Sequence, residues 1–303
     1  DFKDKKALSY FAQKCQAITT EWENIPLETI DLLEEVSVGT VPFYPGRKAF
    51  QVAQDRLLEK QMARRLGIPT PSFWNVVKDG IPDDVVYPVI LKWRNGGYDG
   101  KGQRRVHNKE ELLETFKEWG FRNCIAEEII LFESEISQII TRGVSGYAVA
   151  FHPFMNWHVD GMLDKTRWPA PGITNDSRYF AREYALQIAN DLDVVGLLAL
   201  EMFKMHDGTL IFNEIAPRPH NSGHLTIECS TISQFDLHIR SVMELPITHP
   251  RMVSPGLMLN MIGGLSLSEN MFLQPNAHIH IYGKEDRERR KVGHITITTE
   301  PRQ

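Results

Sequence analysis

The chain has 303 residues, of which 42% are hydrophobic and 24% charged, a balance typical of folded globular proteins rather than disordered or fibrous ones. Its 34 Lys and Arg residues and 39 Asp and Glu residues leave a formal net charge of −5, which argues against a general nucleic-acid-binding protein. The longest apolar run, 194–200, is far shorter than the roughly 18 residues of a membrane span, so we expect no membrane partner. Three widely spaced cysteines without a C-x-x-C pattern favour reduced thiols in a cytoplasmic protein.

Helical and strand-like patterns alternate along the chain. A β-prone run at 16–20 precedes a turn at Pro26, and a helix is predicted from Ala49 to Leu66 with a stop at Gly67. Further helices are predicted at 110–119 and 175–192, the latter capped by Asn175 and Asp176, and further strands at 85–93, 104–107, 124–128, 135–142, 147–151, 278–282 and 292–298. This order predicts an α+β fold with antiparallel strand pairs.

Two β runs within 197–214 are joined by Asp207-Gly208, a strong hairpin signal. A two-residue loop there places Glu201 opposite Glu214, with Cβ atoms roughly 5 Å apart. Adjacent like charges are tolerated when a hard cation lies between them, and Mg²⁺ is commonly held by one or two carboxylates together with substrate phosphates. We therefore expect Glu201 and Glu214 to bind a metal. The alternative is a solvated hairpin with two unrelated acids, which the apolar neighbours disfavour.

A glycine-rich segment follows the apolar strand that ends in Lys92. It has four glycines between Gly96 and Gly102, with strand-like patterns on both sides, whereas Walker A and Rossmann loops open a helix. Backbone N–H groups of such a loop can bind phosphate oxygens, and Lys92 can supply a positive charge. A plain glycine hairpin is the alternative, but together with the paired glutamates the segment favours a nucleotide site.

The second strand of the hairpin runs into a loop, Pro217 to His224, that must lie beside the expected metal site. Prolines on both sides of Arg218 restrict its backbone, which suits an anion-binding arginine. His220 and His224 are four residues apart, as in some metal sites, but the loop is a poor helix and no third soft ligand is near. Contact with an anion or a substrate is therefore favoured over a zinc site.

A basic turn lies between the last two predicted strands. Five of its nine residues, 283–291, are Lys or Arg. Such a run is usually a solvated turn, but a small substrate with a phosphate group would also require it, because Arg matches phosphate geometry. An RNA-binding hairpin is the third interpretation, and the negative net charge and the lack of interleaved aromatic residues disfavour it.

Three of these segments, in this order, resemble one enzyme family over nearly the whole chain. They are Gly97-Tyr98-Asp99-Gly100-Lys101-Gly102-Gln103, Asn213 to His224, and Arg290 to His294. The family is 5-(carboxyamino)imidazole ribonucleotide synthetase, an ATP-grasp enzyme of purine biosynthesis. The resemblance implies an α+β ATP-grasp fold with a partial Rossmann-like domain at 1–50, an ATP-grasp domain at 51–246 and a small β-rich domain at 247–303. It also implies a homodimer, a Rossmann-like opening before Asp1 and a tail after Gln303.

The resemblance implies an ATP-dependent carboxylation with ATP and Mg²⁺ as cofactors. ATP would phosphorylate bicarbonate to carboxyphosphate, whose carboxyl group passes to the exocyclic amine of 5-aminoimidazole ribonucleotide, leaving ADP and phosphate. We expect a flap at 96–103 to close over carboxyphosphate and protect it from water.

By resemblance, the expected ATP-binding residues are Arg56, Lys92, Gly97, Gly100, Gly102, Gln103, Glu127, Glu128, Ile129, Ile130, Glu135, His158, Asn213 and Glu214, with 127–130 as the adenine hinge and Glu135 at the ribose. The expected catalytic residues are Tyr98, Asp99, Lys101 and Arg218, and the expected substrate-binding residues are Glu23, Tyr98, Asp99, Arg218, His220, Asn221, Ser222, Lys284, Arg290 and Lys291.

Two other functions are weighed against this one. Another ATP-grasp enzyme, such as the formate-using glycinamide ribonucleotide transformylase, would share the fold and the metal hairpin, but its phosphate flap reads differently. A catalytically silent nucleotide-binding subunit would bind ATP without turnover, and the presence of Lys92, Glu201 and Glu214 argues against it.

Overall fold

The computed structural model describes residues 1–303 except 79, 98–99, 264–272 and 300–303. The helices are α1 (Lys5–Ala12), α2 (Leu27–Ser37), α3 (Arg47–Ala53), α4 (Arg56–Arg65), α5 (Lys109–Glu118), α6 (Asn175–Asp191), α7 (Thr226–Cys229) and α8 (Gln234–Val242), with a 3₁₀ turn at Asn221–Gly223. The strands are β1 (Ile18–Thr19), β2 (Phe43–Tyr44), β3 (Phe73–Val76), β4 (Val89–Trp93), β5 (Gln103–Val106), β6 (Cys124–Glu128), β7 (Ser134–Arg142), β8 (Ala148–Ala150), β9 (Phe154–Val159), β10 (Met162–Trp168), β11 (Gly196–Lys204), β12 (Leu210–Ala216), β13 (Gly256–Ile262), β14 (Ala277–Ile281) and β15 (Lys291–Thr298).

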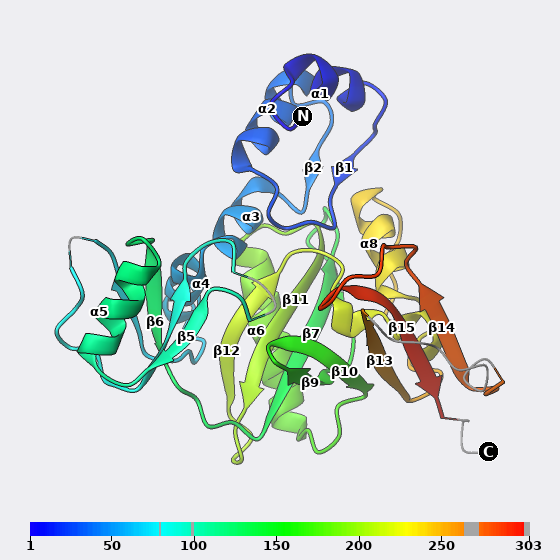
Figure 1. The fold of residues 1–303 in the computed structure, drawn as a ribbon. Helices are drawn as coiled ribbons and strands as arrows, with labels where there is room; N and C mark the ends of the chain where they lie inside the picture. Colours follow the sequence, from blue (N-terminus) through cyan, green and yellow to red (C-terminus); the bar gives the residue numbers. More distant parts are fainter. Residues whose placement is uncertain (79, 98–99, 264–272, 300–303) are drawn as a thin grey trace.

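The strands form three sheets. β1 and β2 pair in parallel in the N-terminal segment. An antiparallel sheet of order β3-β6-β4-β5 packs against α5, and a large sheet runs in the order β12-β11-β7-β9-β10-β13-β15-β14, with β8 beside β7. Figure 1 shows the N-terminal segment above, the four-stranded sheet at the left, and the large sheet across the centre and right. The expected α+β class with antiparallel pairs is confirmed.

Both faces of the large sheet are buried at its β7 and β11 strands. Leu198 and Leu200 pack with α4 and α6 on one face, while Leu197 and Ala199 pack with α7 and α8 on the other. A strand covered on both faces has a nearly continuous apolar sequence, which accounts for the long run at 194–200. Among the described residues, no helix combines the length and the hydropathy needed to cross a membrane.

The predicted single helix from Ala49 to Leu66 is wrong, because α3 and α4 are separate helices. The Asp55 side chain accepts a hydrogen bond from Leu57 N at 2.9 Å and so caps α4. Its carboxylate also binds the Arg94 guanidinium, with 3.0 Å between Arg94 Nε and Asp55 Oδ1. This break brings Arg56 to the start of α4.

Two other element ends differ from the prediction. The strand predicted at 85–93 begins only at Val89, because Pro88 has no N–H to offer a sheet ladder. The helix predicted at 175–192 is capped by Thr174 and not by Asn175 or Asp176, since Thr174 Oγ1 accepts the Ser177 N–H at 3.0 Å. The other predicted helices and strands are confirmed to within about two residues.

Candidate active site

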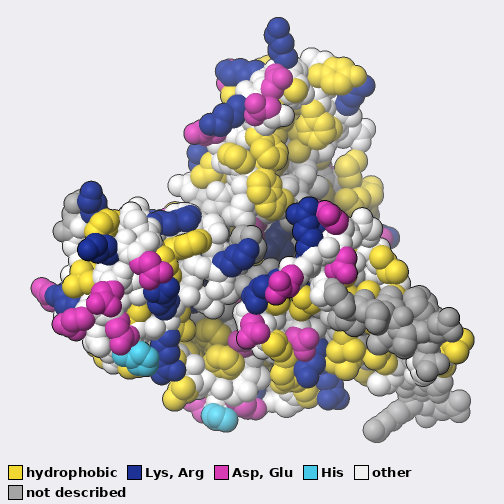
Figure 2. All heavy atoms as spheres, viewed as in Figure 1, with side chains coloured by type: hydrophobic (Ala, Val, Ile, Leu, Met, Phe, Trp, Pro, Cys, Tyr) yellow, Lys and Arg dark blue, Asp and Glu magenta, His cyan; other side chains and the backbone are white. Residues whose placement is uncertain are grey.

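A cavity of about 460 Å³ lies where the N-terminal segment, the four-stranded sheet and the large sheet meet. Figure 2 shows a hollow there with Lys and Arg side chains around it. The expected site residues that line the cavity are Glu23, Arg56, Lys92, Gly97, Gly100, Gln103, Glu135, His158, Glu201, Asn213, Glu214, Arg218, His220, Asn221, Lys284 and Lys291. Segments far apart in sequence thus converge on one space.

Other expected residues lie off the cavity wall. Lys101, Gly102, Glu127, Glu128, Ile129, Ile130, Ser222 and Arg290 are described but do not line the cavity. The Arg290 guanidinium instead donates to the backbone oxygen of Glu285 at 3.3 Å. Tyr98 and Asp99 lie outside the described residues.

The β11–β12 hairpin places Glu201 directly opposite Glu214, as predicted. The loop, however, is longer than two residues, because Met205 N donates to Thr209 O at 2.9 Å and the strands end at Lys204 and Leu210. The predicted pair is therefore correct, but the predicted loop is wrong.

A β-bulge restores the pairing that the longer loop would shift. Next to the loop, Met202 pairs with Phe212, whereas one step further Glu201 pairs with Glu214. Asn213 is the extra residue between Phe212 and Glu214. Without this bulge Glu201 would face Asn213, so the arrangement of the two carboxylates depends on the bulge.

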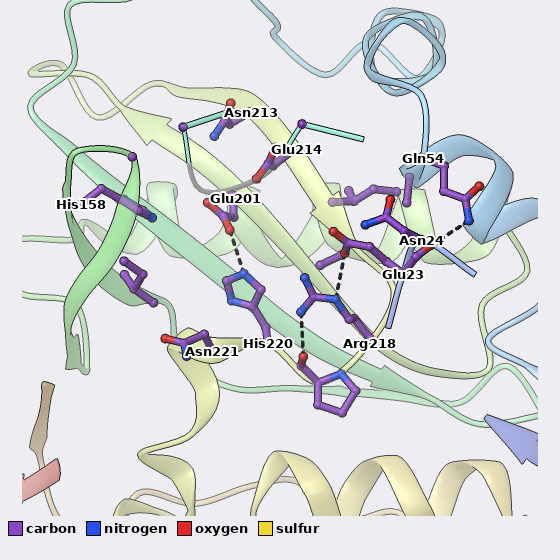
Figure 3. Close-up of a pocket in the computed structure, with 18 of the residues that line it drawn as sticks. Glu23, Asn24, Gln54, His158, Glu201, Asn213, Glu214, Arg218, His220 and Asn221 are labelled. Carbon is purple, nitrogen blue, oxygen red and sulfur yellow. Dashed lines mark hydrogen bonds and ion pairs between the residues drawn. The ribbon is translucent and has the colours of Figure 1, made fainter. Parts of the chain in front are cut away.

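Among the residues that the structure describes, each of these carboxylates is bound by one side chain. Arg56 Nη1 lies 2.6 Å from Glu214 Oε2, and His220 Nε2 lies 2.7 Å from Glu201 Oε1. Burial opposes ionisation of Glu214, but the charge and the hydrogen bond of Arg56 lower its pKa to about 2. Figure 3 shows the Glu201 and Glu214 side chains next to each other, with Asn213 beside them. Two adjacent carboxylates, each bound by a side chain through a single oxygen, fit a hard divalent cation.

Glu59 and Lys60 on α4 were not identified from the sequence. Their exposed fractions are 2% and 1%. Lys60 Nζ lies 2.5 Å from Asn213 O, and Glu59 Oε1 accepts the Ile215 N–H at 2.8 Å. Burial and the charge of Glu214 raise the pKa of Glu59 well above its ordinary value. The available signal was the spacing of Arg56, Glu59 and Lys60, which places three charged residues on one helix face.

Lys92 projects into the cavity from β4 and also has a buried partner. Its Nζ lies 2.8 Å from Glu127 Oε2, and Lys60 Nζ lies 3.6 Å from the same oxygen. Burial opposes the charge of Glu127, but the two lysines lower its pKa to about 2. Two lysine side chains therefore share one carboxylate, with Lys92 at the cavity wall.

Arg218 links the loop after β12 to the N-terminal segment. Its Nε lies 2.9 Å from Glu23 Oε2 and its Nη1 donates to Pro219 O at 3.1 Å. Gln54 Nε2 donates to Glu23 O at 2.7 Å, and Figure 3 shows these groups on one side of the cavity. The segment around Glu23 is thus bound both to Gln54 at the end of α3 and to Arg218 in the loop after β12.

Two histidines are each held by an acid. His158 pairs with Glu135, and although burial would lower the pKa of His158, that hydrogen bond and the nearby carboxylates raise it. His220 is held on its other side, where its Nδ1 lies 2.8 Å from Ser222 Oγ. Ser222 is fully buried and 2.7 Å from Ser137 Oγ, so it contacts His220 and does not reach the cavity wall.

The glycine-rich segment connects β4 and β5, which are antiparallel as predicted. Gly102 has φ of +74°, and a Cβ there would lie 2.3 Å from the Trp93 ring. A Cβ on Gly100 would lie 3.0 Å from Asp160 O in the β9–β10 turn. Glycine at these positions lets the segment pass close to the cavity rim.

The arrangement suits a phosphorylated ligand with a bound cation. Arg56, Lys92, Arg218, Lys284 and Lys291 surround the cavity, and the two hairpin carboxylates lie at its floor. Phosphoryl transfer depends mainly on positioning and on neutralising charge around the phosphates. The cavity provides basic side chains that can position and neutralise phosphates, and carboxylates that can hold a cation.

Comparisons with known proteins agree with this chemistry. Residues 61–235 match the ATP-grasp domain family, and residues 256–303 match the phosphoribosylaminoimidazole carboxylase C-terminal domain. An N5-carboxyaminoimidazole ribonucleotide synthase from Pseudomonas aeruginosa is 37% identical over 98% of this chain and 81% of its own length.

Solved structures give the same result. An N5-carboxyaminoimidazole ribonucleotide synthetase from Thermus thermophilus superimposes with a TM-score of 0.91 at 40% identity, covering 99% of this chain and 82% of that one. An Aspergillus clavatus N5-carboxyaminoimidazole synthase solved with ADP and 5-aminoimidazole ribonucleotide has a TM-score of 0.88 at 28% identity, over 99% of this chain and 81% of that one. The chain belongs to the N5-carboxyaminoimidazole ribonucleotide synthase family of ATP-grasp enzymes.

Proposed function

We propose that this chain carboxylates 5-aminoimidazole ribonucleotide with bicarbonate at the expense of ATP. The γ-phosphoryl group passes from ATP to bicarbonate, giving carboxyphosphate and ADP. The exocyclic amine then attacks the carboxyl carbon, phosphate leaves, and the amine loses a proton to give N5-carboxyaminoimidazole ribonucleotide. The observation that carries the proposal is the Glu201–Glu214 pair at the floor of a cavity lined by Arg56, Lys92 and Arg218.

In this proposal the nucleotide occupies the side of the cavity near the four-stranded sheet. Arg56 and Lys92 bind phosphate oxygens, and the glycine-rich segment covers them. Residues 127–130 form the adenine hinge, with Glu135 and His158 near the ribose. Mg²⁺ would be held by Glu201 and Glu214 and would neutralise charge on the transferring phosphoryl group.

The ribonucleotide and bicarbonate occupy the opposite side. His220 binds Glu201 directly and Arg218 lies in the same loop, and Lys284 and Lys291 provide positive charge for the ribonucleotide phosphate. Glu23 orients Arg218 through their ion pair of 2.9 Å. No protein nucleophile is required, because a bicarbonate oxygen attacks the γ-phosphorus of ATP and the amine attacks the carboxyl carbon of carboxyphosphate.

The organisation of the protein is proposed along the same lines. We propose the division into 1–50, 51–246 and 247–303, which contains both family matches within single parts. We also propose a cytoplasmic homodimer, which the family resemblance supports.

The test is ADP release with Mg-ATP and bicarbonate, with and without 5-aminoimidazole ribonucleotide, on the wild type and on Glu214→Gln. We expect the ribonucleotide to stimulate release, and Glu214→Gln to reduce it by roughly two orders of magnitude or more. Asp207→Asn is the matched control, because it makes the same change at the exposed tip of the same hairpin. Stimulation by formate instead of bicarbonate would indicate a different ATP-grasp ligase, and nucleotide binding without turnover would indicate a silent subunit.

A further inference from the structure

The bulge at Asn213 lies on β12, which pairs only with β11 among the strands that the structure describes. β12 is the edge of the large sheet, so its outer backbone groups have no ladder partner. A bulge also removes ladder partners on the inner side. Because buried N–H and C=O groups are costly when unpaired, the bulge needs hydrogen-bond partners from elsewhere in the fold.

The Phe212 N–H donates to Pro69 O at 2.7 Å, and two charged side chains of α4 supply further partners. Lys60 Nζ donates to Asn213 O at 2.5 Å and lies 3.5 Å from Phe212 O. Glu59 Oε1 accepts the Ile215 N–H at 2.8 Å. The Lys60 ammonium group therefore lies at the carbonyls of the bulge, and the Glu59 carboxylate binds the N–H of Ile215, just after the bulge.

The alternative register shows what these contacts prevent. If the pairing next to the loop continued without the bulge, Glu214 would lie opposite Leu200 in place of Glu201. Successive residues of a strand face opposite sides of the sheet, so Glu214 would then share the face of Leu200, which packs in the core. A one-residue shift would separate the two carboxylates completely.

We propose that Glu59 and Lys60 are positioning residues that hold the bulge at Asn213 and thereby keep Glu201 and Glu214 together as a divalent-cation site. This inference rests on the proposed function for the identity of the cation site. It assigns a role to two residues that touch the backbone of the hairpin and neither reacting atom.

The two side chains make separable predictions. Lys60→Met removes the donor to the bulge carbonyls and keeps the length of the side chain. Glu59→Met removes the acceptor for Ile215 N–H, whereas Glu59→Gln keeps an oxygen in the same place. Lys204→Met is the matched control, because Lys204 is 4% exposed on the same hairpin and its Nζ binds Glu133 Oε2 at 2.6 Å.

The test measures Mn²⁺ binding to the full chain in the presence of ADP, by electron paramagnetic resonance of the free ion. We expect Lys60→Met and Glu59→Met each to weaken Mn²⁺ binding roughly tenfold or more, and Glu59→Gln and Lys204→Met to stay within about twofold of the wild type. Amide hydrogen exchange of Ile215 should accelerate in Glu59→Met and not in Lys204→Met.

Several outcomes would overturn the inference. Mn²⁺ binding and Ile215 exchange that are unchanged in Lys60→Met and Glu59→Met would do so, as would an equal loss in Lys204→Met, which would indicate general destabilisation. If Lys60→Met does not fold, the comparison of Glu59→Met with Glu59→Gln decides. A wild type that binds Mn²⁺ with ADP but does not carboxylate the ribonucleotide would contradict the proposed function alone, and a wild type that binds no Mn²⁺ would contradict both.

Discussion

The buried carboxylate of Glu127 allows a quantitative test of how its interactions with Lys92 and Lys60 contribute to stability. It is 2% exposed and is bound by Lys92, with Lys60 close to the same oxygen. Burial opposes its charge, but the lysines lower its pKa from the ordinary 4.5 to about 2. The difference between these pKa values corresponds to about 3 kcal/mol of folding free energy.

The sign of the pH dependence follows from the direction of the change. Because the pKa is lower in the folded state than in the unfolded state, the stabilisation is fully present above about pH 4.5 and is lost as the pH falls towards 2. By the same relation, about 2 kcal/mol should remain at about pH 3.5. The contribution of Glu127 therefore shrinks by about a third between neutral and acidic pH.

Glu127→Gln removes the charge and keeps the shape of the side chain. We expect it to lose about 3 kcal/mol of unfolding free energy at pH 7, measured by urea denaturation, and about 2 kcal/mol at pH 3.5. Glu114→Gln on the exposed side of α5 is the control and should change little at either pH. Equal stability of Glu127→Gln and the wild type, or a difference that does not depend on pH, would refute this reasoning.

Two further predictions concern the glycine-rich segment and a buried histidine. Gly102→Ala should lower kcat for ADP release about tenfold or more, because its Cβ would lie 2.3 Å from the Trp93 ring, whereas Gly39→Ala, with a similar φ of +68° and open space around it, should not. Burial lowers the pKa of His238 to about 4, so thermal stability should fall as the pH drops from about 6.5 towards 4. His238→Gln should remove only part of that pH dependence, because burial also lowers the pKa of His294 to about 4 and lowers the pKa of His224. The exposed His206→Gln should leave it as in the wild type, and the reverse result would contradict the contribution of His238.

The local patterns predicted most elements and brought the main site segments together. The strand at 124–128 has the predicted bounds, and the glycine-rich segment does connect antiparallel strands. These features depend on neighbouring residues, on apolar periodicity and on turn chemistry. Features of this kind can be read from one sequence.

Three strands with buried polar side chains, β9, β10 and β13, were not predicted. Asn156 in β9, Thr166 in β10 and Asn260 in β13 are all buried and interrupt the apolar pattern. Thr166 Oγ1 donates to Asn156 Oδ1 at 2.9 Å across neighbouring strands. Asn156 and Thr166 bind each other, and Asn260 Nδ2 donates to Leu163 O at 2.7 Å; such partners make burial tolerable but are not neighbours in the sequence.

The helix break and the buried charges of α4 depend on remote partners in the same way. Asp55 ends α3 and caps α4 while it binds Arg94, which lies 39 residues later. Glu59 and Lys60 read as solvated helix residues in the sequence, yet they are buried against β12. Charged residues on a predicted helix are normally placed outside, and only the fold shows that these two bind backbone groups of β12 and that Lys60 also lies near the Glu127 carboxylate.

The hairpin shows how a correct pair can follow from an incorrect turn. Asp207-Gly208 predicts a two-residue loop, and that loop alone would have placed Glu201 opposite Glu214. The actual loop is longer and would shift the ladder by one residue, and the bulge at Asn213 reverses the shift. A two-residue loop with a regular ladder and a longer loop with a bulge therefore both place Glu201 opposite Glu214. With the longer loop, a ladder without the bulge would send Glu214 to the opposite face of the sheet. The turn residues do not decide between the ladder with the bulge and the ladder without it. The contacts from α4 to Asn213 O and Ile215 N favour the ladder with the bulge.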